Sequence, residues 1–284
     1  MTPTAEAVLD DASLRALLSL LDEEQDSSRE LVESRVRGLL DRSAGRVDAL
    51  RSGLSEQAAF RLGELLEEHR WNGLQLRLRA LDASADSYLE SALTILSSFA
   101  DPALPAGAIG ARLDEWAKEL SWAQTPRTEP VAVLHRVNDF LFLRCGLRGE
   151  AVDGHRPDGW SLHKVLESRR GAPLMLAAVY LLIGRRIGLG LNGLIVPGHW
   201  LLSYDGSRQR LYVDACHGGR ILNAADCEAE VQRRGLRLEP WQLLPVQHST
   251  LFSRAVSGMA GAYARQGDRR RSERLAGLRP LSSA

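Results

Sequence analysis

The sequence predicts an α+β fold in which helices precede a small antiparallel sheet. Three observations predict it. Apolar residues recur at helical spacing through the first third of the chain. Residues 169–188, RRGAPLMLAAVYLLIGRRIG, form the least polar stretch of helix length. Downstream of that stretch the apolar period falls from 3.6 to about 2, which is typical of strands.

The first helices are predicted from leucine and valine positions. Two helices are expected within residues 13–40, a third follows Ser55, and a fourth ends at Asp101–Pro102. Another helix, 111–123, lies between two proline-containing breaks, of which the second covers residues 125–130. We place a domain boundary at this second break and expect a helical N-terminal region over residues 1–128.

The middle of the chain is expected to form one core over residues 129–247. It contains a helix at 131–146, a loop at 147–160 and a short helix beginning at Ser161. Residues 191–206 are predicted as one strand interrupted at Pro197–Gly198, and residues 208–219 as the returning strand. The remainder, 248–284, is predicted as a short helical pair hinged at Gly267–Asp268.

The composition excludes several classes of protein. The formal net charge is zero, so we expect neither a nucleic acid nor a membrane as partner. Three cysteines without a CxxC arrangement argue against a disulfide framework and a cysteine-rich zinc site. No apolar run reaches the roughly 18–20 residues of a membrane span, and the first residues lack the apolar core of a signal peptide. We expect a cytoplasmic protein without a cofactor.

The order helix, strand, strand can build a nucleophile, a general base and an orienting group. A cysteine in the first turn of the apolar helix would have its thiol pKa lowered by the helix dipole. His199 on the first strand would be the base, and Asp214 on the second would orient its imidazole. The residues alone also allow His199 to satisfy its nitrogens locally and Asp214 to cap the following turn, and without further information this structural role is favoured.

Several segments resemble the transglutaminase-like core of the invasion-regulator (SirB-type) family. They are ESRRGAPLMLAAVYLLIGRRIGL, VPGHWLL, YVDACHGGRIL and, before them, NDFLFLRCGLRGE. The resemblance extends from about residue 87 to the segment near residue 268. It implies a papain-like core with a central helix and antiparallel strands, preceded by helices and followed by tetratricopeptide-type helices. It also implies a Cys-His-Asp triad in which His199 and Asp214 are the histidine and the aspartate.

The resemblance places the nucleophile in the first turn after Gly171, where this chain has Ala172, Pro173, Leu174 and Met175. Many relatives carry a serine at about this point. Pro173 suits the first position of a helix, so the backbone feature is retained. Met175 stands at the expected nucleophile position, but a thioether has no ionisable proton and normally fills apolar gaps. Loss of a triad nucleophile typically costs on the order of 10⁶ in rate. His199 and Asp214 are therefore interpreted as a vestigial dyad.

Two other chemistries remain open. Cys216 lies two positions after Asp214 and is a candidate alternative nucleophile, although a buried cysteine is usually inert. A metal site could form from His199, His217 and Asp214, with His155 or His163 as further candidates. Nothing in the spacing fixes its geometry, so we expect no metal.

Binding is the leading functional hypothesis. Trp200, Tyr180 and Trp160 are candidates to line a cleft beside His199, although large aromatic residues more often serve the core. His217 is a further binding candidate that also fits packing at the Gly218–Gly219 turn. We therefore expect a non-catalytic binding or regulatory protein with a protein or peptide partner, and leave its oligomeric state open. The alternative is a hydrolase or amide transferase that uses Cys216 with His199 and Asp214.

Overall fold

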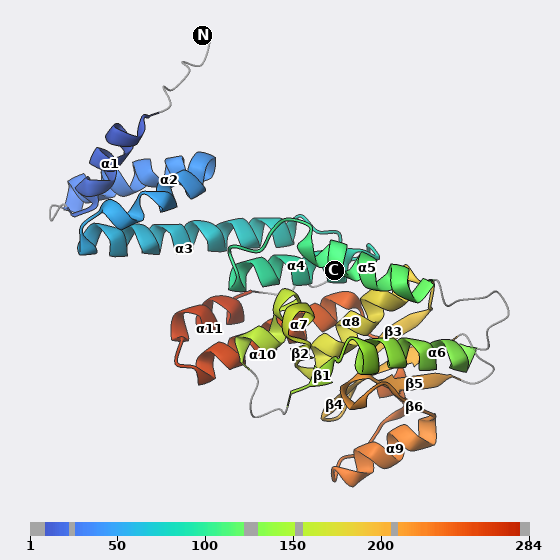
Figure 1. The fold of residues 1–284 in the computed structure, drawn as a ribbon. Helices are drawn as coiled ribbons and strands as arrows, with labels where there is room; N and C mark the ends of the chain where they lie inside the picture. Colours follow the sequence, from blue (N-terminus) through green and yellow to red (C-terminus); the bar gives the residue numbers. More distant parts are fainter. Residues whose placement is uncertain (1–8, 23–25, 122–129, 151–155, 206–209, 279–284) are drawn as a thin grey trace. The chain divides into compact units, whose positions relative to one another are not determined.

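Helices dominate the structure, and a small sheet lies in its second half (Figure 1). The computed structural model describes residues 9–22, 26–121, 130–150, 156–205 and 210–278. The chain divides into two compact units, Met1–Arg77 and Leu78–Ala284. This division falls elsewhere than the boundary we predict at residue 128, and the three-part division stays a prediction.

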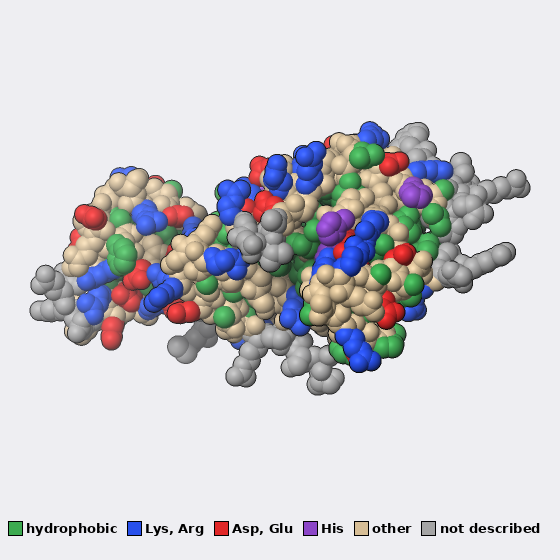
Figure 2. Space-filling view, turned by 90° about the horizontal axis from the view of Figure 1, so that it is seen from below, with side chains coloured by type: hydrophobic (Ala, Val, Ile, Leu, Met, Phe, Trp, Pro, Cys, Tyr) green, Lys and Arg blue, Asp and Glu red, His purple; other side chains and the backbone are tan. Residues whose placement is uncertain are grey.

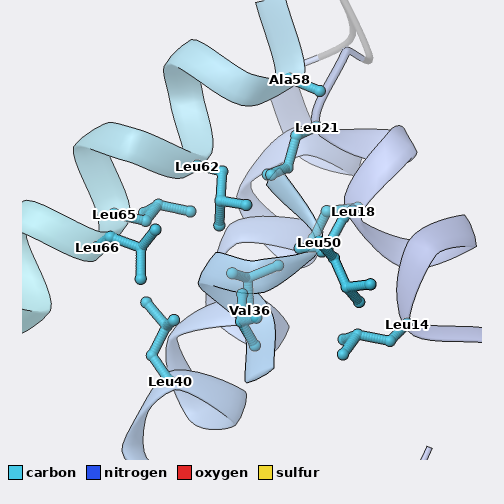
Figure 3. Packing of buried hydrophobic residues seen from close by; sticks show 12 residues of the cluster. Leu14, Leu18, Leu21, Val36, Leu40, Leu50, Ala58, Leu62, Leu65 and Leu66 are labelled. Carbon is cyan, nitrogen blue, oxygen red and sulfur yellow. The ribbon is translucent and has the colours of Figure 1, made fainter. Parts of the chain in front are cut away.

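The first unit is helical. Its elements are α1 (Asp11–Ser19), η1 (Leu20–Asp22), α2 (Asp26–Ala49), η2 (Arg51–Gly53) and α3 (Glu56–Arg79). Figure 3 shows how leucine side chains from α1, α2 and α3 point toward one another, as the helical spacing of those leucines predicts. Non-helical backbone angles at Ser43 put a kink within α2.

The second unit contains the remaining helices. They are α4 (Tyr88–Ala100), α5 (Ala108–Ser121), α6 (Pro130–Asn138), the π-helical turn η3 (Asp139–Arg144), η5 (Pro157–Trp160), α7 (Leu162–Ser168), α8 (Pro173–Arg186), η6 (Ala215–His217), α9 (Ala224–Arg233), η7 (Pro240–Leu243), α10 (His248–Arg265) and α11 (Arg269–Ala276). The α10–α11 pair, joined at Gly267–Asp268, forms as the sequence predicts. Helix α8 corresponds to the apolar stretch and is buried along almost its whole length.

The sheet is antiparallel and has the strand order β3-β4-β5-β6. Its strands are β3 (Leu191–Val196), β4 (His199–Tyr204), β5 (Leu211–Asp214) and β6 (Arg220–Leu222). A separate parallel pair joins β1 (Arg148–Gly149) to β2 (Arg170–Gly171). With helices before a small antiparallel sheet, the α+β prediction is confirmed.

One detail of the strand prediction is wrong. Residues 191–206 contain two paired strands, β3 and β4, rather than one interrupted strand. Pro197 and Gly198 form the tight turn between them, because Val196 pairs directly with His199. Gly198 has φ +70°, a conformation that a glycine adopts without a steric cost. The turn makes His199 the first residue of β4.

Helices cover both faces of the four-stranded sheet. Helix α8 packs against β3 and β4, and α5, α7 and α10 pack against α8. On the opposite face, side chains of the sheet form a core cluster with Cys227 and Val231 of α9. The central helix and the sheet thus position the candidate triad residues, which lie in the first turn of α8, at the start of β4 and at the end of β5.

The surface of the molecule is of mixed charge. Figure 2 shows Lys and Arg side chains interspersed with Asp and Glu side chains on the face that it displays, where histidine side chains also reach the surface. In the described parts of the chain, none of the helices has both the length and the apolar character needed to cross a membrane.

Candidate functional site

The start of α8 is fixed by the segments that precede it. Ala172 is the N-cap residue and Pro173 occupies the first helical position, as predicted from the sequence. The Ala172 N–H donates a hydrogen bond of 2.9 Å to the carbonyl oxygen of Gly159. Met175 is the third residue of the helix, and its side chain has no exposed surface. Its thioether therefore fills core space at the beginning of the central helix.

His199 and Asp214 come together at neighbouring ends of β4 and β5. Nε2 of His199 lies 2.8 Å from Oδ1 of Asp214, so the two residues do form the pair that the strand order suggests. His199 is only 8% exposed and Asp214 is completely buried. The Nε2–H direction is nevertheless off the line of a hydrogen bond, which leaves this buried nitrogen without an aligned partner.

Asp214 also organises the turn that follows β5. Its Oδ1 accepts hydrogen bonds from the backbone N–H groups of Cys216 at 3.1 Å and His217 at 3.2 Å. Its Oδ2 lies 2.8 Å from Nδ1 of His217. Asp214 was expected either to orient His199 or to cap the following turn. Its carboxylate does both, because it caps the turn η6 (Ala215–His217) and contacts His199.

The charge state of Asp214 follows from these contacts. Burial raises the pKa of the carboxyl group, but the close approach and charge of the His199 and His217 imidazoles outweigh it, so the pKa is lowered from its ordinary value of 3.8. Asp214 is therefore a buried carboxylate between two imidazoles, whose ring centroids lie 5.4 Å apart.

Asn138 holds the end of this turn in place. It is a site residue that was not predicted from the sequence. Its Nδ2 donates a hydrogen bond of 2.6 Å to the carbonyl oxygen of Gly219, and its Oδ1 accepts one of 2.9 Å from the hydroxyl of Tyr180. Gly219 has φ +75°, and a β-carbon there would lie 2.0 Å from Oδ1 of Asn138. The only sequence signal was the NDFLFLR segment, which begins with this asparagine.

The surroundings of Cys216 do not favour a nucleophilic thiolate. Its Sγ lies against Gly149, where a β-carbon would approach the sulfur to 2.7 Å. Gly149 pairs with Gly171, two residues before Pro173, so this turn and the start of α8 both adjoin the β1–β2 pair. Burial raises the pKa of the Cys216 thiol, and the negative charge of Asp214 raises it further.

The three predicted aromatic residues occupy different environments. Tyr180 is completely buried, and its ring stacks on Phe142, so it packs in the core rather than in a cleft. The Trp160 ring packs on α10, where a β-carbon at Gly258 would lie 2.3 Å from it. Trp200, by contrast, lines an open groove of about 650 Å³ together with His199.

The groove combines segments that are distant in sequence. Its lining residues are Ile195, Val196, Pro197, Gly198, His199, Trp200, Trp241, Gln242, Leu244, Pro245, Val246 and Arg254. Trp241 is 66% exposed, and the Leu244 side chain also reaches solvent. Neither residue was predicted as functional, because both follow the strands in a stretch without a recognisable motif.

The other metal-ligand candidates are not part of this cluster. His163 lies beside Asp101, with 3.8 Å between Nε2 and Oδ2. His155 falls outside the described residues. His199, Asp214 and His217 each offer one ligand atom, and these atoms lie within 4.8 Å of one another. The structure thus supplies the geometry that the spacing alone left open.

Comparisons with known proteins match the same part of the chain. The family model described as the Transglutaminase-like superfamily matches residues 107–257. A UPF0162 protein of Xylella fastidiosa (strain 9a5c) is 30% identical over 134 residues, which are 45% of this chain and 48% of the relative. A UPF0162 protein of Vibrio cholerae is 29% identical over 37% of this chain and 40% of the relative.

A eukaryotic protein shares a shorter segment. F-box only protein 21 of Mus musculus is 28% identical over 34% of this chain and 17% of the relative. The chain thus spans about half the length of the Xylella relatives and a smaller part of F-box only protein 21. No solved structure matches the chain.

Proposed function

The chain belongs to the transglutaminase-like superfamily, and from this premise we propose that it is a non-catalytic member that binds a peptide or protein segment. The observation that carries the proposal is the burial of Met175 at the third position of α8. That position is where the resemblance places a nucleophile. A thioether has no ionisable proton that His199 could withdraw. Met175 therefore cannot act as the nucleophile that forms an acyl intermediate.

The alternative, a hydrolase or amide transferase based on Cys216, has weaker support. The sulfur is half-buried against Gly149 in a 3₁₀ turn. A reactive cysteine usually sits at a helix N-terminus or beside a cation, where its thiolate is stabilised. For Cys216, burial and the carboxylate of Asp214 raise the pKa of the thiol, and the positive charge of Arg234 offsets them only in part.

The groove beside His199 supports binding of a peptide. Trp200 and the exposed Trp241 provide apolar surface with polar edges, the kind of surface that is enriched where proteins bind partners. His199 contributes to the same groove, so the histidine of the dyad forms part of its wall.

The charge of the groove indicates the chemistry of its ligand. Arg254 of α10 is exposed and lines the groove, and in the described part of the chain no acidic side chain pairs with it. A guanidinium group binds carboxylates through two parallel hydrogen bonds. We therefore propose a peptide segment in which an aromatic or aliphatic side chain adjoins a carboxylate.

A displayed library of random peptides, selected on the full chain, tests this proposal. We expect enrichment of peptides with a large apolar residue beside Asp, Glu or a free C-terminus. Because exposed aromatic anchors dominate many interfaces, Trp241→Ala should weaken an enriched peptide at least about 10-fold. Arg254→Glu should weaken it to a similar extent by reversing the charge.

Arg237→Glu is the matched control. Arg237 is highly exposed, pairs only at the surface with Glu239 at 3.1 Å, and is absent from the groove lining. This variant changes the net charge by the same amount as Arg254→Glu and should bind the peptide within about twofold of the wild type. If both reversals weaken binding equally, or if selection enriches no peptide, the groove is not the binding site.

We further propose a subfamily, a type of C-terminal tail and a cellular location for this chain. The motifs quoted above support membership of the SirB-type group within the superfamily, and the α10–α11 pair is compatible with a shortened tetratricopeptide-type tail. The three cysteines are free, which is usual for a protein of the cytoplasm. We propose the cytoplasm as its location.

A further inference from the structure

Three donor groups of the kind that bind zinc converge after β5. They are Nε2 of His199, the carboxylate of Asp214 and Nδ1 of His217, and each donor atom lies within 4.8 Å of the others. Two imidazoles and one carboxylate form a common protein ligand set for zinc and related divalent cations. They come from β4, from the end of β5 and from the turn η6, so the fold and not local spacing brings them together.

The His199 imidazole provides a second observation that points to a ligand. It is more than nine-tenths buried, and its Nε2 has no aligned hydrogen-bond partner although Oδ1 of Asp214 is 2.8 Å away. A buried polar atom without a partner is unfavourable and requires an explanation. A cation bound by the imidazole and the carboxylate would give Nε2 a partner. The nitrogen would then be deprotonated and would donate its lone pair to the cation instead of donating a hydrogen bond.

The carboxylate is held rigidly in place. Two backbone N–H groups of η6 donate to Oδ1 of Asp214, and Asn138 fixes the end of the same turn through Gly219. Hydrogen bonds of this kind around a ligand orient it and tune its affinity for a metal. Asp214 is therefore preorganised as a ligand rather than free to rotate away.

Access is provided by His217. Its side chain is 55% exposed, whereas Asp214 behind it is fully buried. Zinc bonds to nitrogen and oxygen are about 2.0–2.2 Å long, so two ligands of one ion lie at most about 4.2 Å apart. Donor atoms separated by no more than 4.8 Å reach this spacing through a small rotation of the exposed imidazole.

We infer that His199, Asp214 and His217 bind one divalent cation of the zinc class. Three protein ligands leave a coordination position open toward the side on which His217 meets solvent. The inference does not depend on the proposed function, because peptide binding through Trp241 and Arg254 can fail while the metal still binds.

Zinc binding to the full chain tests the inference directly. The protein is stripped with a chelator and titrated with zinc chloride in competition with a chromophoric zinc indicator. We expect one zinc ion per chain and a loss of affinity of about 100-fold or more in His217→Ala, since removal of a direct ligand should exceed the 10–100-fold effect of its supporting partners. His217 is exposed, so this substitution should leave the fold intact.

His69→Ala is the matched control, because His69 also lies beside a carboxylate, with 3.3 Å between its Nδ1 and Oδ1 of Asp41. It should leave zinc affinity unchanged. Cobalt(II) loading of the wild-type chain gives an independent readout, with visible bands for nitrogen and oxygen ligands and no thiolate charge-transfer band. Absence of stoichiometric zinc, equal affinity in the two variants, or a thiolate band would each overturn the inference.

Discussion

Arg234, the C-cap residue of α9, donates a hydrogen bond of 2.9 Å from Nη1 to the carbonyl oxygen of Gly198, the residue just before His199. The guanidinium group is itself held by Glu230, with 3.4 Å between Nη2 and Oε1. The same carboxylate pairs with Arg220 of β6 at 2.6 Å and with Arg233 at 2.7 Å. Glu230 thus links α9 to the turn that presents His199 and to the edge of the sheet.

This linkage predicts an acid-dependent loss of stability. The hydrogen bond from Arg220 is the main cause that lowers the pKa of Glu230 from its ordinary value of 4.5. A lowered pKa in the folded state means that the stabilisation is complete above pH 4.5 and is lost as the pH falls through the folded value. Glu230→Gln should therefore reduce the free energy of unfolding by about 1 kcal/mol at pH 7, and by progressively less below pH 4.5.

Urea unfolding at several pH values measures this difference. Glu228→Gln on the same helix is the control, because its carboxylate accepts a hydrogen bond from Gln232 instead of forming the arginine cluster. A destabilisation by Glu230→Gln that is the same at pH 7 and pH 3 would contradict the role of its charge.

The turn after Asp214 should tolerate a side chain at one glycine and not at the next. Gly218 has φ +68° with open space around its missing β-carbon, so Gly218→Ala should cost only the backbone strain of about 1–2 kcal/mol. At Gly219 the β-carbon would also displace Asn138 and break its bonds to Gly219 and Tyr180. Gly219→Ala should cost about 3 kcal/mol or more in urea unfolding. Equal costs would mean that Asn138 does not lock the turn.

Met175 should behave as a core residue. Met175→Leu conserves volume and should cost less than about 1.5 kcal/mol, with peptide binding unchanged. Met175→Ala leaves a cavity in a fully buried position and should cost about 2–5 kcal/mol. Thermal unfolding of both variants, with peptide affinity at a temperature where both are folded, separates packing from function. A loss of binding in a stable Met175→Leu protein would assign the sulfur a role beyond packing.

Much of the frame of the site could be predicted from local sequence patterns. The apolar stretch and Pro173 indicate the start of α8, and the change of period indicates the strands that carry His199 and Asp214. The Pro197–Gly198 turn was missed although its dipeptide is a turn signal, because the apolar residues on both sides were read as one strand.

The remaining features depend on contacts between distant segments. Asn138 donates a hydrogen bond to Gly219, 81 positions away in the sequence. Arg254 lines the same groove as Ile195, which belongs to a different element. Periodicity describes which face of an element is apolar and contains no information on which elements meet. His217 was considered for a metal site only by residue type, and its 2.8 Å approach to Asp214 required the folded turn.

The site-resolved alkylation rate of Cys216 most directly tests the absence of a nucleophile. Full chain and His199→Ala protein are treated with iodoacetamide at pH 7 in the presence of a chelator, with free glutathione as the reference thiol, and the modified peptide is quantified by mass spectrometry. Because the sulfur is half-buried against Gly149, we expect Cys216 to react no faster than glutathione and at the same rate in both proteins. Rapid labelling that His199→Ala abolishes would show a working Cys216–His199 pair and contradict a non-catalytic protein.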